Sequence, residues 1–395
     1  MAPSILDNLD QLAGKTLLIR VDFNCPLADG KVSDSTRIDR VLPGLKQLTE
    51  AGAGLVLLSH LGRPKGQIVP AFSLQPICDY LSDSLGYAVP LMADLEAAVR
   101  PAAGQMVMAE NLRFWAEEEA NDDGFAARLA ALGDIYVNDA FSCAHRAHAS
   151  THALARLVPA FAGPVMAAEL KALGAVLNEP QRPVAAVVGG AKVSTKLAVL
   201  THLIEKVDLL LLGGGMANTF LAAQGQNMGA SLMEADLVDT AAEIIAAADK
   251  KGCKLILPED GLAAGDFKAG APHRQIRNSD ILATEMMLDI GPAAIKHYQQ
   301  ALVGVRTVLW NGPMGAFEIS PFDRATVALA QAVATATQAG DLLSVAGGGD
   351  TVAALNHAGV TDKFSYVSLA GGAFLEYIEG KTLPGVAVLA EQPIS

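Results

Sequence analysis

Arginines and one histidine recur along the first half of the sequence in a pattern suited to binding a small, multiply charged anion. Each lies at or near the end of a short apolar run. These residues are Arg37, His60, Arg63, Arg113 and Arg146. A lone surface arginine usually pairs with a carboxylate or caps a helix, and a lone histidine is often only a structural donor. Together they would form a rigid set of donors, because guanidinium groups bind phosphate and carboxylate through paired hydrogen bonds.

Glycine-rich turns follow the apolar runs of the second half instead. They are 189–192, 213–215, 311–315 and 347–350. Glycine lets backbone N–H groups approach a phosphate, which then lies at the positive end of the following helix. A single turn of this kind often serves only close packing. Several in one half, together with Lys192, Lys196 and Asp350, predict a site for the polyphosphate of a nucleotide.

The charged residues of these turns have definite expected positions. Lys192 and Lys196 are four residues apart, so we expect one helix face to carry both directly after the Gly-Gly turn. Asp350 follows three glycines and suits the N-cap of a helix. Its alternative role is a contact with nucleotide-bound Mg²⁺, a cation that prefers oxygen ligands.

Two common nucleotide-binding motifs do not occur in the sequence. It contains no G-x-x-x-x-G-K-[ST] and no G-x-G-x-x-G. A P-loop ATPase and an ordinary dinucleotide-binding dehydrogenase therefore both lack their main signature.

Histidine and cysteine offer further candidates for chemistry. His145, His148 and His152 have helical spacing, which superficially suggests a metal site. Cys143 lies in the same turn, but no general base is evident beside it, so a catalytic thiol is not expected. The four cysteines are scattered without a C-x-x-C pair. That scatter favours free thiols in a reducing compartment, and we expect a cytoplasmic protein.

The elements that must position these residues are short apolar runs alternating with helical stretches. The expected strands are 16–21, 55–59, 87–92 (weakened by Pro90), 105–109, 135–138, 184–188, 207–212, 253–257, 305–310, 342–346 and 364–368. Continuous apolar runs of this length indicate parallel strands buried on both faces, and ligands bind beyond the carboxyl ends of such strands. We therefore expect an α/β protein with two doubly wound, Rossmann-like parallel-sheet domains.

Length and composition set further limits. A chain of 395 residues is too long for one ordinary core. A polar segment with two prolines, 178–183, separates the two series of strands, and a helix over Pro164–Leu177 would join them as a hinge. The net charge of −13 argues against nucleic-acid and anionic-membrane partners. No secretory signal and no apolar run of about 20 residues is evident, and we expect a monomer.

A series of motifs resembles the phosphoglycerate kinase family, in the family's order along essentially the whole chain. The motifs are RVDFNCP (20–26), STR (35–37), SHLGRP (59–64), ENLRF (110–114), NDAFSCAHRAH (138–148), GGAKVSTK (189–196), GGGMANTF (213–220), WNGPMGAFE (310–318) and GGGDT (347–351). The resemblance implies a glycolytic phosphotransferase. Its reaction is reversible transfer between 1,3-bisphosphoglycerate with MgADP and 3-phosphoglycerate with MgATP, without a metal at the histidines above.

The resemblance also implies roles for individual residues. Phosphoglycerate would be bound by Asp22, Asn24, Arg37, His60, Arg63, Arg113 and Arg146. The nucleotide would be bound by Gly190, Lys192, Lys196, Gly214, Gly215, Leu288, Asn311, Glu318, Gly347, Gly348, Gly349, Asp350 and Thr351, with Mg²⁺ at Asp350. We expect a phosphoglycerate domain at 1–168, a hinge helix and nucleotide domain at 169–375, and a C-terminal segment, 376–395, that packs back on the first domain.

The implied reaction needs no general base, because the accepting carboxylate of 3-phosphoglycerate is already ionised at neutral pH. We expect in-line transfer that depends on positioning and charge. Arg37, Lys192 and the amides of Gly371 and Gly372 would stabilise the transferring phosphoryl group. Closure of the two domains about the hinge would exclude water.

Several positions depart from the family's usual pattern. Thr195 replaces an aspartate, and Ser142-Cys143 replaces Gly-Thr. Leu369 and Ala370 replace a threonine and a glycine in the turn before Gly371, where we expect reduced or retuned turnover rather than inactivity.

Two rival readings remain. One is a nicotinamide-dependent oxidoreductase, which the missing G-x-G-x-x-G disfavours. The other is a nucleotide-sensing scaffold whose activity has decayed, with Leu369 and Ala370 as its signs. Intact Arg37, Lys192 and Asp350 argue against decay.

Overall fold

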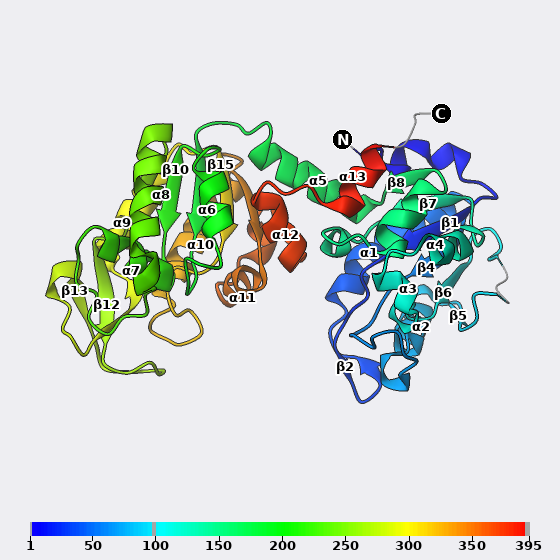
Figure 1. The fold of residues 1–395 in the computed structure, drawn as a ribbon, viewed down its shortest axis with the longest axis horizontal. Helices are drawn as coiled ribbons and strands as arrows, with labels where there is room; N and C mark the ends of the chain where they lie inside the picture. Colours follow the sequence, from blue (N-terminus) through cyan, green and yellow to red (C-terminus); the bar gives the residue numbers. More distant parts are fainter. Residues whose placement is uncertain (1, 97–99, 392–395) are drawn as a thin grey trace. The chain divides into compact units, whose positions relative to one another are not determined.

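A computed structural model of the chain describes residues 2–96 and 100–391. The chain divides into two compact units (Figure 1). Unit one comprises Met1–Leu170 and Thr382–Ser395, and unit two comprises Lys171–Lys381. Helix α5, Pro164–Leu177, runs across the boundary between them. In the described ranges, no helix is both long enough and apolar enough to cross a bilayer.

Unit one is built on a six-stranded parallel sheet of order β5-β6-β4-β1-β7-β8. Its strands are β1 (Thr16–Arg20), β4 (Gly54–Leu58), β5 (Leu91–Met92), β6 (Met106–Ala109), β7 (Ile135–Asn138) and β8 (Ala160–Ala162). Every residue of β1 and β4 is buried, as expected for strands covered on both faces. Strand β8 was not predicted, because its three residues make too short an apolar run. A two-stranded ribbon of β2 (Leu27–Ala28) and β3 (Lys31–Val32) was also not predicted.

The helices of unit one bury apolar stripes against this sheet. In α1 the buried residues Ile38, Val41, Leu45 and Leu48 recur at helical spacing. The helices are α1 (Thr36–Glu50), α2 (Gln75–Leu85), α3 (Ala116–Glu119), α4 (Asp123–Ala130) and α13 (Pro384–Ala390).

Unit two contains a second six-stranded parallel sheet, of order β11-β10-β9-β15-β16-β17. Its strands are β9 (Val184–Val188), β10 (Leu209–Leu212), β11 (Lys254–Ile256), β15 (Thr307–Asn311), β16 (Leu343–Gly347) and β17 (Tyr366–Ser368). Its helices are α6 (Leu197–Leu203), α7 (Gly214–Ala223), α8 (Val238–Lys251), α9 (Pro292–Ala301), α10 (Arg324–Gln338), α11 (Gly349–His357) and α12 (Gly371–Ile378). Numbered within the sheet, the strand order is 3-2-1-4-5-6, the order of the doubly wound nucleotide-binding fold. The predicted α/β class with two parallel sheets is confirmed.

Unit two also carries a three-stranded antiparallel sheet that was not predicted. It consists of β12 (Asp260–Ala264), β13 (His273–Arg277) and β14 (Met286–Ile290), in the order β13-β12-β14. Strand β13 has one buried residue in five, so it offers no apolar run. Its pairing depends on partners elsewhere in the chain, which local patterning does not show.

The C-terminal segment returns to unit one and packs beside the turn that follows β7. Gly385 N donates to Ala144 O at 2.9 Å, and Asn138 Nδ2 donates to Gly385 O at 3.2 Å. A Cβ at Gly385 would lie 3.0 Å from Ala144 Cα, so any larger residue would push the two segments apart by a few tenths of an ångström. Leu389 of α13 is 1% exposed. The helix therefore packs against the turn and the segments that follow it with buried apolar side chains.

Shortening Leu389 to alanine should destabilise unit one by about 2–5 kcal/mol, because a buried side chain is replaced by a cavity. The chain has two tryptophans, Trp115 in unit one and Trp310 in unit two. Urea unfolding followed by Trp115 fluorescence, in a Trp310→Phe background, measures the effect. Glu391→Ala, an exposed position just beyond the same helix, is the control and should shift the midpoint little. Equal midpoints for Leu389→Ala and the control would contradict a supporting role of α13.

Candidate active site

In unit one the carboxyl ends of three neighbouring strands lie level. Arg20, at the end of β1, pairs with Leu58 of β4 on one side and with Asn138 of β7 on the other. Asp22 comes two residues after Arg20, and His60 comes two residues after Leu58. Both therefore lie at the same edge of the sheet. The strand order reverses between β1 and β7, and ligands bind at such points in open parallel sheets.

Asp22 is the centre of a hydrogen-bonded group at this edge. Its Oδ2 accepts hydrogen bonds from Arg37 Nη1 and from Ser142 Oγ, both at 2.5 Å. Its Oδ1 accepts from the backbone N–H of Asn24 at 3.2 Å. A carboxylate held by three donors is poorly placed to accept a proton from a substrate. Asp22 instead holds Arg37, in the first turn of α1, at the edge of the sheet.

Two further predicted residues bond to the backbone of Gly62. Asn24 Oδ1 accepts from Gly62 N at 3.0 Å, and Arg113 Nη1 donates to Gly62 O at 2.8 Å. Arg113 Nε also lies 3.3 Å from Glu119 Oε1. These bonds tie the loop after β4 to the loops after β1 and β6.

Arg63 and Arg146 lie at the surface of unit one, and both side chains are exposed. The charge of Arg146 helps to lower the pKa of His148, so the Arg146 guanidinium lies close enough to His148 to act on it electrostatically. Asp22 bonds to Arg37 and to the backbone of Asn24, and a ring nitrogen of His60 lies within 4.8 Å of an Asp22 carboxylate oxygen. Within residues 2–96 and 100–391, the side chains of Arg63 and Arg146 form no hydrogen bond or ion pair, so both can reach a ligand.

His60 is neutral and offers an N–H donor. Burial, followed by the positive charges of Arg20 and Arg113, holds its pKa well below the usual value. Arg20 Nη2 lies 3.1 Å from His60 Nδ1. Because a guanidinium group can only donate, Nδ1 must accept and the ring proton lies on Nε2. An imidazole in this state can donate a hydrogen bond to an anion without carrying charge.

Arg20 is itself buried, with 1% of its surface exposed. Its Nε donates to Ser150 Oγ at 2.9 Å, and Ser150 Oγ donates to Glu118 Oε1 at 2.6 Å. Glu118 is 1% exposed, and burial raises its pKa while the charge of Arg20 opposes that shift. The sequence analysis did not identify this series of hydrogen bonds from Arg20 through Ser150 to Glu118. The available signal was a charged residue, Arg20, inside a strand expected to be buried on both faces.

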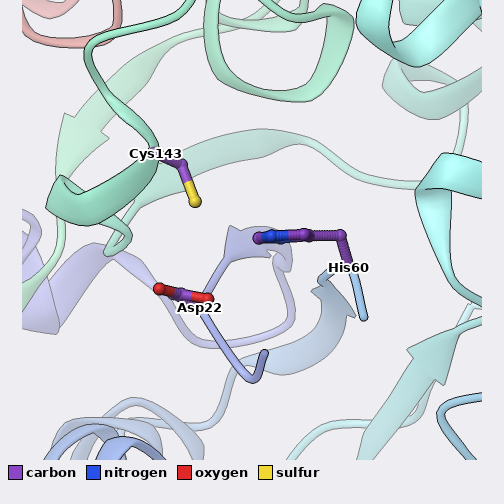
Figure 2. Close-up of side chains that lie close together, drawn as sticks. All are labelled: Asp22, His60 and Cys143. Carbon is purple, nitrogen blue, oxygen red and sulfur yellow. The ribbon is translucent and has the colours of Figure 1, made fainter. Parts of the chain in front are cut away.

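Asp22, His60 and Cys143 point toward one another from three separate segments (Figure 2). Their ligand atoms lie within 4.8 Å of one another, a spacing that could hold a metal ion. A cation does not suit the group, however, because Arg20 occupies His60 Nδ1 and also lies 3.7 Å from Cys143 Sγ. Burial raises the pKa of the Cys143 thiol, whereas a metal ligand must be deprotonated. The group therefore fits an anion better than a cation.

The three neighbouring histidines have other contacts. His148 Nδ1 lies 4.0 Å from Glu118 Oε1, and burial with nearby arginines lowers the pKa of His148 to about 4. His152 Nδ1 lies 3.2 Å from Asn121 Nδ2. His145 is at intermediate exposure.

In unit two the glycine-rich turns also follow one level row of strand ends. Val188 of β9 pairs with Leu212 of β10 and with Asn311 of β15, at the reversal of strand order. Gly214 has φ +68°, and a Cβ there would lie 2.6 Å from Gly190 O, so the first two turns touch through their backbones.

Not every glycine amide in these turns is available to a ligand. Gly213 N donates to Val188 O at 3.1 Å, and Gly214 N donates to Met314 O at 2.8 Å. Gly312 N donates to Thr351 Oγ1 at 2.8 Å. These bonds hold the turns together. Gly215 instead lies in the first turn of α7, where backbone N–H groups have no partner within the helix.

The prediction that Lys192 and Lys196 share a helix face is wrong. Helix α6 begins only at Leu197, and Lys196 is its N-cap residue. The segment before it is held out of helical geometry because the backbone N–H and hydroxyl of Ser194 donate to Glu234, at 2.9 and 2.5 Å. Lys192 is exposed in this loop, whereas Lys196 is partly buried.

Lys196 lies against Asn311 at the end of β15. Its Nζ donates to Asn311 Oδ1, and Asn311 Nδ2 donates to Gly347 O at 2.7 Å. Burial lowers the pKa of Lys196 to about 8, an effect that the carboxylate of Asp350 opposes. A bound anion would therefore favour the protonated ammonium.

Asp350 is not the N-cap of α11. The helix begins at Gly349 with Gly348 as its N-cap, which places Asp350 in the first turn with its side chain exposed. The φ of Gly348 is +100°, which glycine adopts readily, and the helix starts two residues ahead of the expected position. An exposed carboxylate near the ammonium of Lys196 can supply an oxygen ligand to a hard cation such as Mg²⁺.

The remaining predicted residues of unit two lie in three places. Leu288 is in β14, half-buried, and its carbonyl accepts from Ala316 N at 2.8 Å. Glu318 is exposed in the loop after β15. Gly371 and Gly372 form the start of α12, so their N–H groups belong to a helix N-terminus. Ala370 N, just before them, donates to the Ser368 hydroxyl at 3.2 Å.

Comparison with known proteins places these features in a family. The model of the family described as "Phosphoglycerate kinase" matches residues 6–381. The chain is 56% identical over 397 residues to the phosphoglycerate kinase of Rhodospirillum centenum, covering 98% of this chain and 100% of that protein. It is 54% identical over 390 residues to that of Agrobacterium fabrum, covering 97% and 98%.

Solved structures agree. The structure of phosphoglycerate kinase from Coxiella burnetii has a TM-score of 0.94 at 44% identity and covers 99% of each chain. The phosphoglycerate kinase from Pyrococcus horikoshii OT3 has a TM-score of 0.80 at 30% identity, covering 98% of each chain. Two arginine- and glycine-lined sheet edges, a family match along nearly the whole chain and these relatives lead to one conclusion: the chain belongs to the phosphoglycerate kinase family.

Proposed function

We propose that the sheet edge around Asp22 in unit one binds phosphoglycerate and that the glycine-rich edge of unit two binds the nucleotide. The activity itself follows from the family: reversible phosphoryl transfer between 1,3-bisphosphoglycerate and 3-phosphoglycerate in glycolysis. The observation that carries the assignment of the first edge is the Arg37–Asp22 pair beside a neutral His60. Arg37 and His60 offer N–H donors to a ligand, and Arg37 adds a positive charge that Asp22 holds in place. Asn24, Arg63, Arg113 and Arg146 complete the proposed set in unit one.

The nucleotide assignment is supported by the strand order and by the turns. The reversal between β9 and β15 is where doubly wound sheets bind nucleotides. The proposed set is Gly190, Lys192, Lys196, Gly214, Gly215, Leu288, Asn311, Glu318, Gly347, Gly348, Gly349, Asp350 and Thr351. Within it, Gly214 and Thr351 would act by holding the turns, because their polar groups already bond within the protein.

We further propose direct in-line transfer without a general base. The attacking carboxylate of 3-phosphoglycerate is already ionised, so the residues need only position the reactants and stabilise charge. Arg37, Lys192 and the amides of Gly371 and Gly372 would contact the transferring phosphoryl oxygens. Because the two substrates are assigned to different units, the units must close on each other during the reaction, with α5 and the turn at 368–372 as hinges.

Mg²⁺, a monomeric state and a cytoplasmic location are also proposals. The exposed carboxylate of Asp350 fits Mg²⁺, which proteins usually hold through one or two carboxylates plus substrate phosphates. When bound with the nucleotide, the ion would neutralise phosphate charge. The acidic chain with four free cysteines is in keeping with a cytoplasmic protein, and light scattering of the purified protein would test the monomer.

Replacing Arg37 by alanine should lower kcat by roughly 10²–10³-fold, since one preorganised donor to the transferring group is lost. Steady-state kinetics with 3-phosphoglycerate and MgATP measure the change. Arg100→Ala is the matched control, because Arg100 pairs with Asp134 at the opposite, amino end of the same sheet. The control should stay within about twofold of the parent. A loss below tenfold in Arg37→Ala would remove Arg37 from the mechanism.

Asp350→Asn should raise the Mg²⁺ concentration needed for half-maximal activity at least about tenfold. The gain in ADP affinity that Mg²⁺ produces, measured by calorimetry with and without the ion, should shrink in parallel. Asp341→Asn is the control, because Asp341 is exposed at the amino end of β16, away from the turn after it. An unchanged Mg²⁺ dependence in Asp350→Asn would exclude Asp350 as the ligand.

The neutral state of His60 predicts a loss of stability in acid. Its folded pKa is lowered well below the ordinary value near 6.5, so the unfolded chain binds a proton first as the pH falls. Stability should therefore decline between about pH 7 and pH 5, and His60→Gln should decline less. The same Trp115 unfolding assay measures this slope. Part of the slope should persist because the pKa of His148 is also lowered, to about 4. Identical slopes would mean that His60 is not held neutral.

A further inference from the structure

Ser142 donates to the same carboxylate oxygen that holds Arg37. It lies in the short helical turn Phe141–Cys143 that follows β7, on a different segment from Asp22 and from Arg37. Ser142 Oγ and Arg37 Nη1 each lie 2.5 Å from Asp22 Oδ2. Two donors from two different segments therefore meet at one carboxylate oxygen.

The sharing of one oxygen has a consequence for the arginine. A guanidinium group has five N–H donors and readily bonds a carboxylate through two parallel hydrogen bonds. Here the contact joins Arg37 Nη1 to Asp22 Oδ2, while Asp22 Oδ1 faces the backbone of Asn24. The Ser142 hydroxyl occupies one acceptor position on Oδ2 beside the Arg37 contact. Among the described residues, the contact with Asp22 uses Nη1 of Arg37, so its other N–H groups are available to an anion.

The two partners differ in how firmly they are held. The side chain of Asp22 is 12% exposed, whereas that of Arg37 is 36% exposed. A long, half-exposed arginine takes its position from the group it pairs with, so a carboxylate free to turn would carry the guanidinium with it. We propose that Ser142 is a positioning residue: through Asp22 it fixes where Arg37 meets the phosphoglycerate. This inference rests on the proposed role of Arg37, which the Arg37→Ala measurement tests separately.

Ser142→Ala should weaken 3-phosphoglycerate binding about five- to tenfold, because Arg37 is then less ordered before the ligand binds and must be ordered on binding. Calorimetry with 3-phosphoglycerate alone gives this change without the chemical step. The KM for MgATP should stay unchanged, and the midpoint of unit-one unfolding should fall only slightly, because Asp22 keeps its other two donors. Ser142→Thr keeps a hydroxyl and should restore binding to within about threefold. Ser84→Ala, an exposed serine of α2, is the control for removing a hydroxyl and should have no effect.

A double-mutant cycle shows whether the effect passes through Asp22. In an Asp22→Ala background, Ser142→Ala should change 3-phosphoglycerate affinity less than twofold, because the intermediary is gone. An equal loss in both backgrounds would overturn the inference, as would unchanged affinity in Ser142→Ala alone. Should Asp22→Ala fail to fold, the decisive comparison is Ser142→Thr against Ser142→Ala. Equal affinities in that pair would overturn the inference.

Discussion

The buried guanidinium of Arg20 is the constraint on which the site of unit one depends. A charge removed from water must be surrounded by hydrogen-bond partners. Arg20 finds them in the carbonyl of the adjoining Val21 and, on two other segments, in Ser150 and His60. Each partner is then fixed in turn. His60 must keep its acceptor nitrogen toward Arg20, so its N–H faces away from it. One buried charge thus selects the tautomer and the direction of a side chain at the sheet edge, and it adds to the burial that lowers the pKa of His60.

The sequence predicted the strands and the sheet edge that position these residues better than it predicted the contacts between side chains. Strands such as β1 and β9 are continuous apolar runs because both of their faces are covered, and residues that follow them, such as Asp22 and His60, could be placed at one edge. Strand β13 could not be found, because its polar residues pair only in the tertiary structure. The helix expected to carry Lys192 failed for a similar reason, since Ser194 bonds to Glu234, which lies 40 residues further along.

The glycine turns of unit two show the same division between local pattern and tertiary role. The sequence indicates where glycines leave the backbone uncovered by side chains, but it does not show which of their N–H groups already bond within the protein. Gly214 and Gly312 donate inside the protein, and their conformations let the turns approach one another. Packing and ligand binding therefore use neighbouring residues of one motif. This is why a count of glycines overstates the donors that a nucleotide can meet.

The acid and base candidates of unit one point to the kind of chemistry the site can support. The carboxylate of Asp22 is occupied by three donors, the pKa of His60 is lowered by burial and arginines, and burial raises the pKa of the Cys143 thiol. His60 and the Cys143 thiol are thereby made poor proton acceptors from substrate, and the oxygens of Asp22 already face donors of the protein. A reaction that had to remove a proton would be impaired by such a site. Transfer to a carboxylate that is already ionised loses nothing by it, because its barrier falls through charge and geometry alone. The hydrogen bonds that occupy Asp22 and His60 also hold the donors of the site in place. The same bonds therefore disfavour proton removal and favour phosphoryl transfer by charge and geometry.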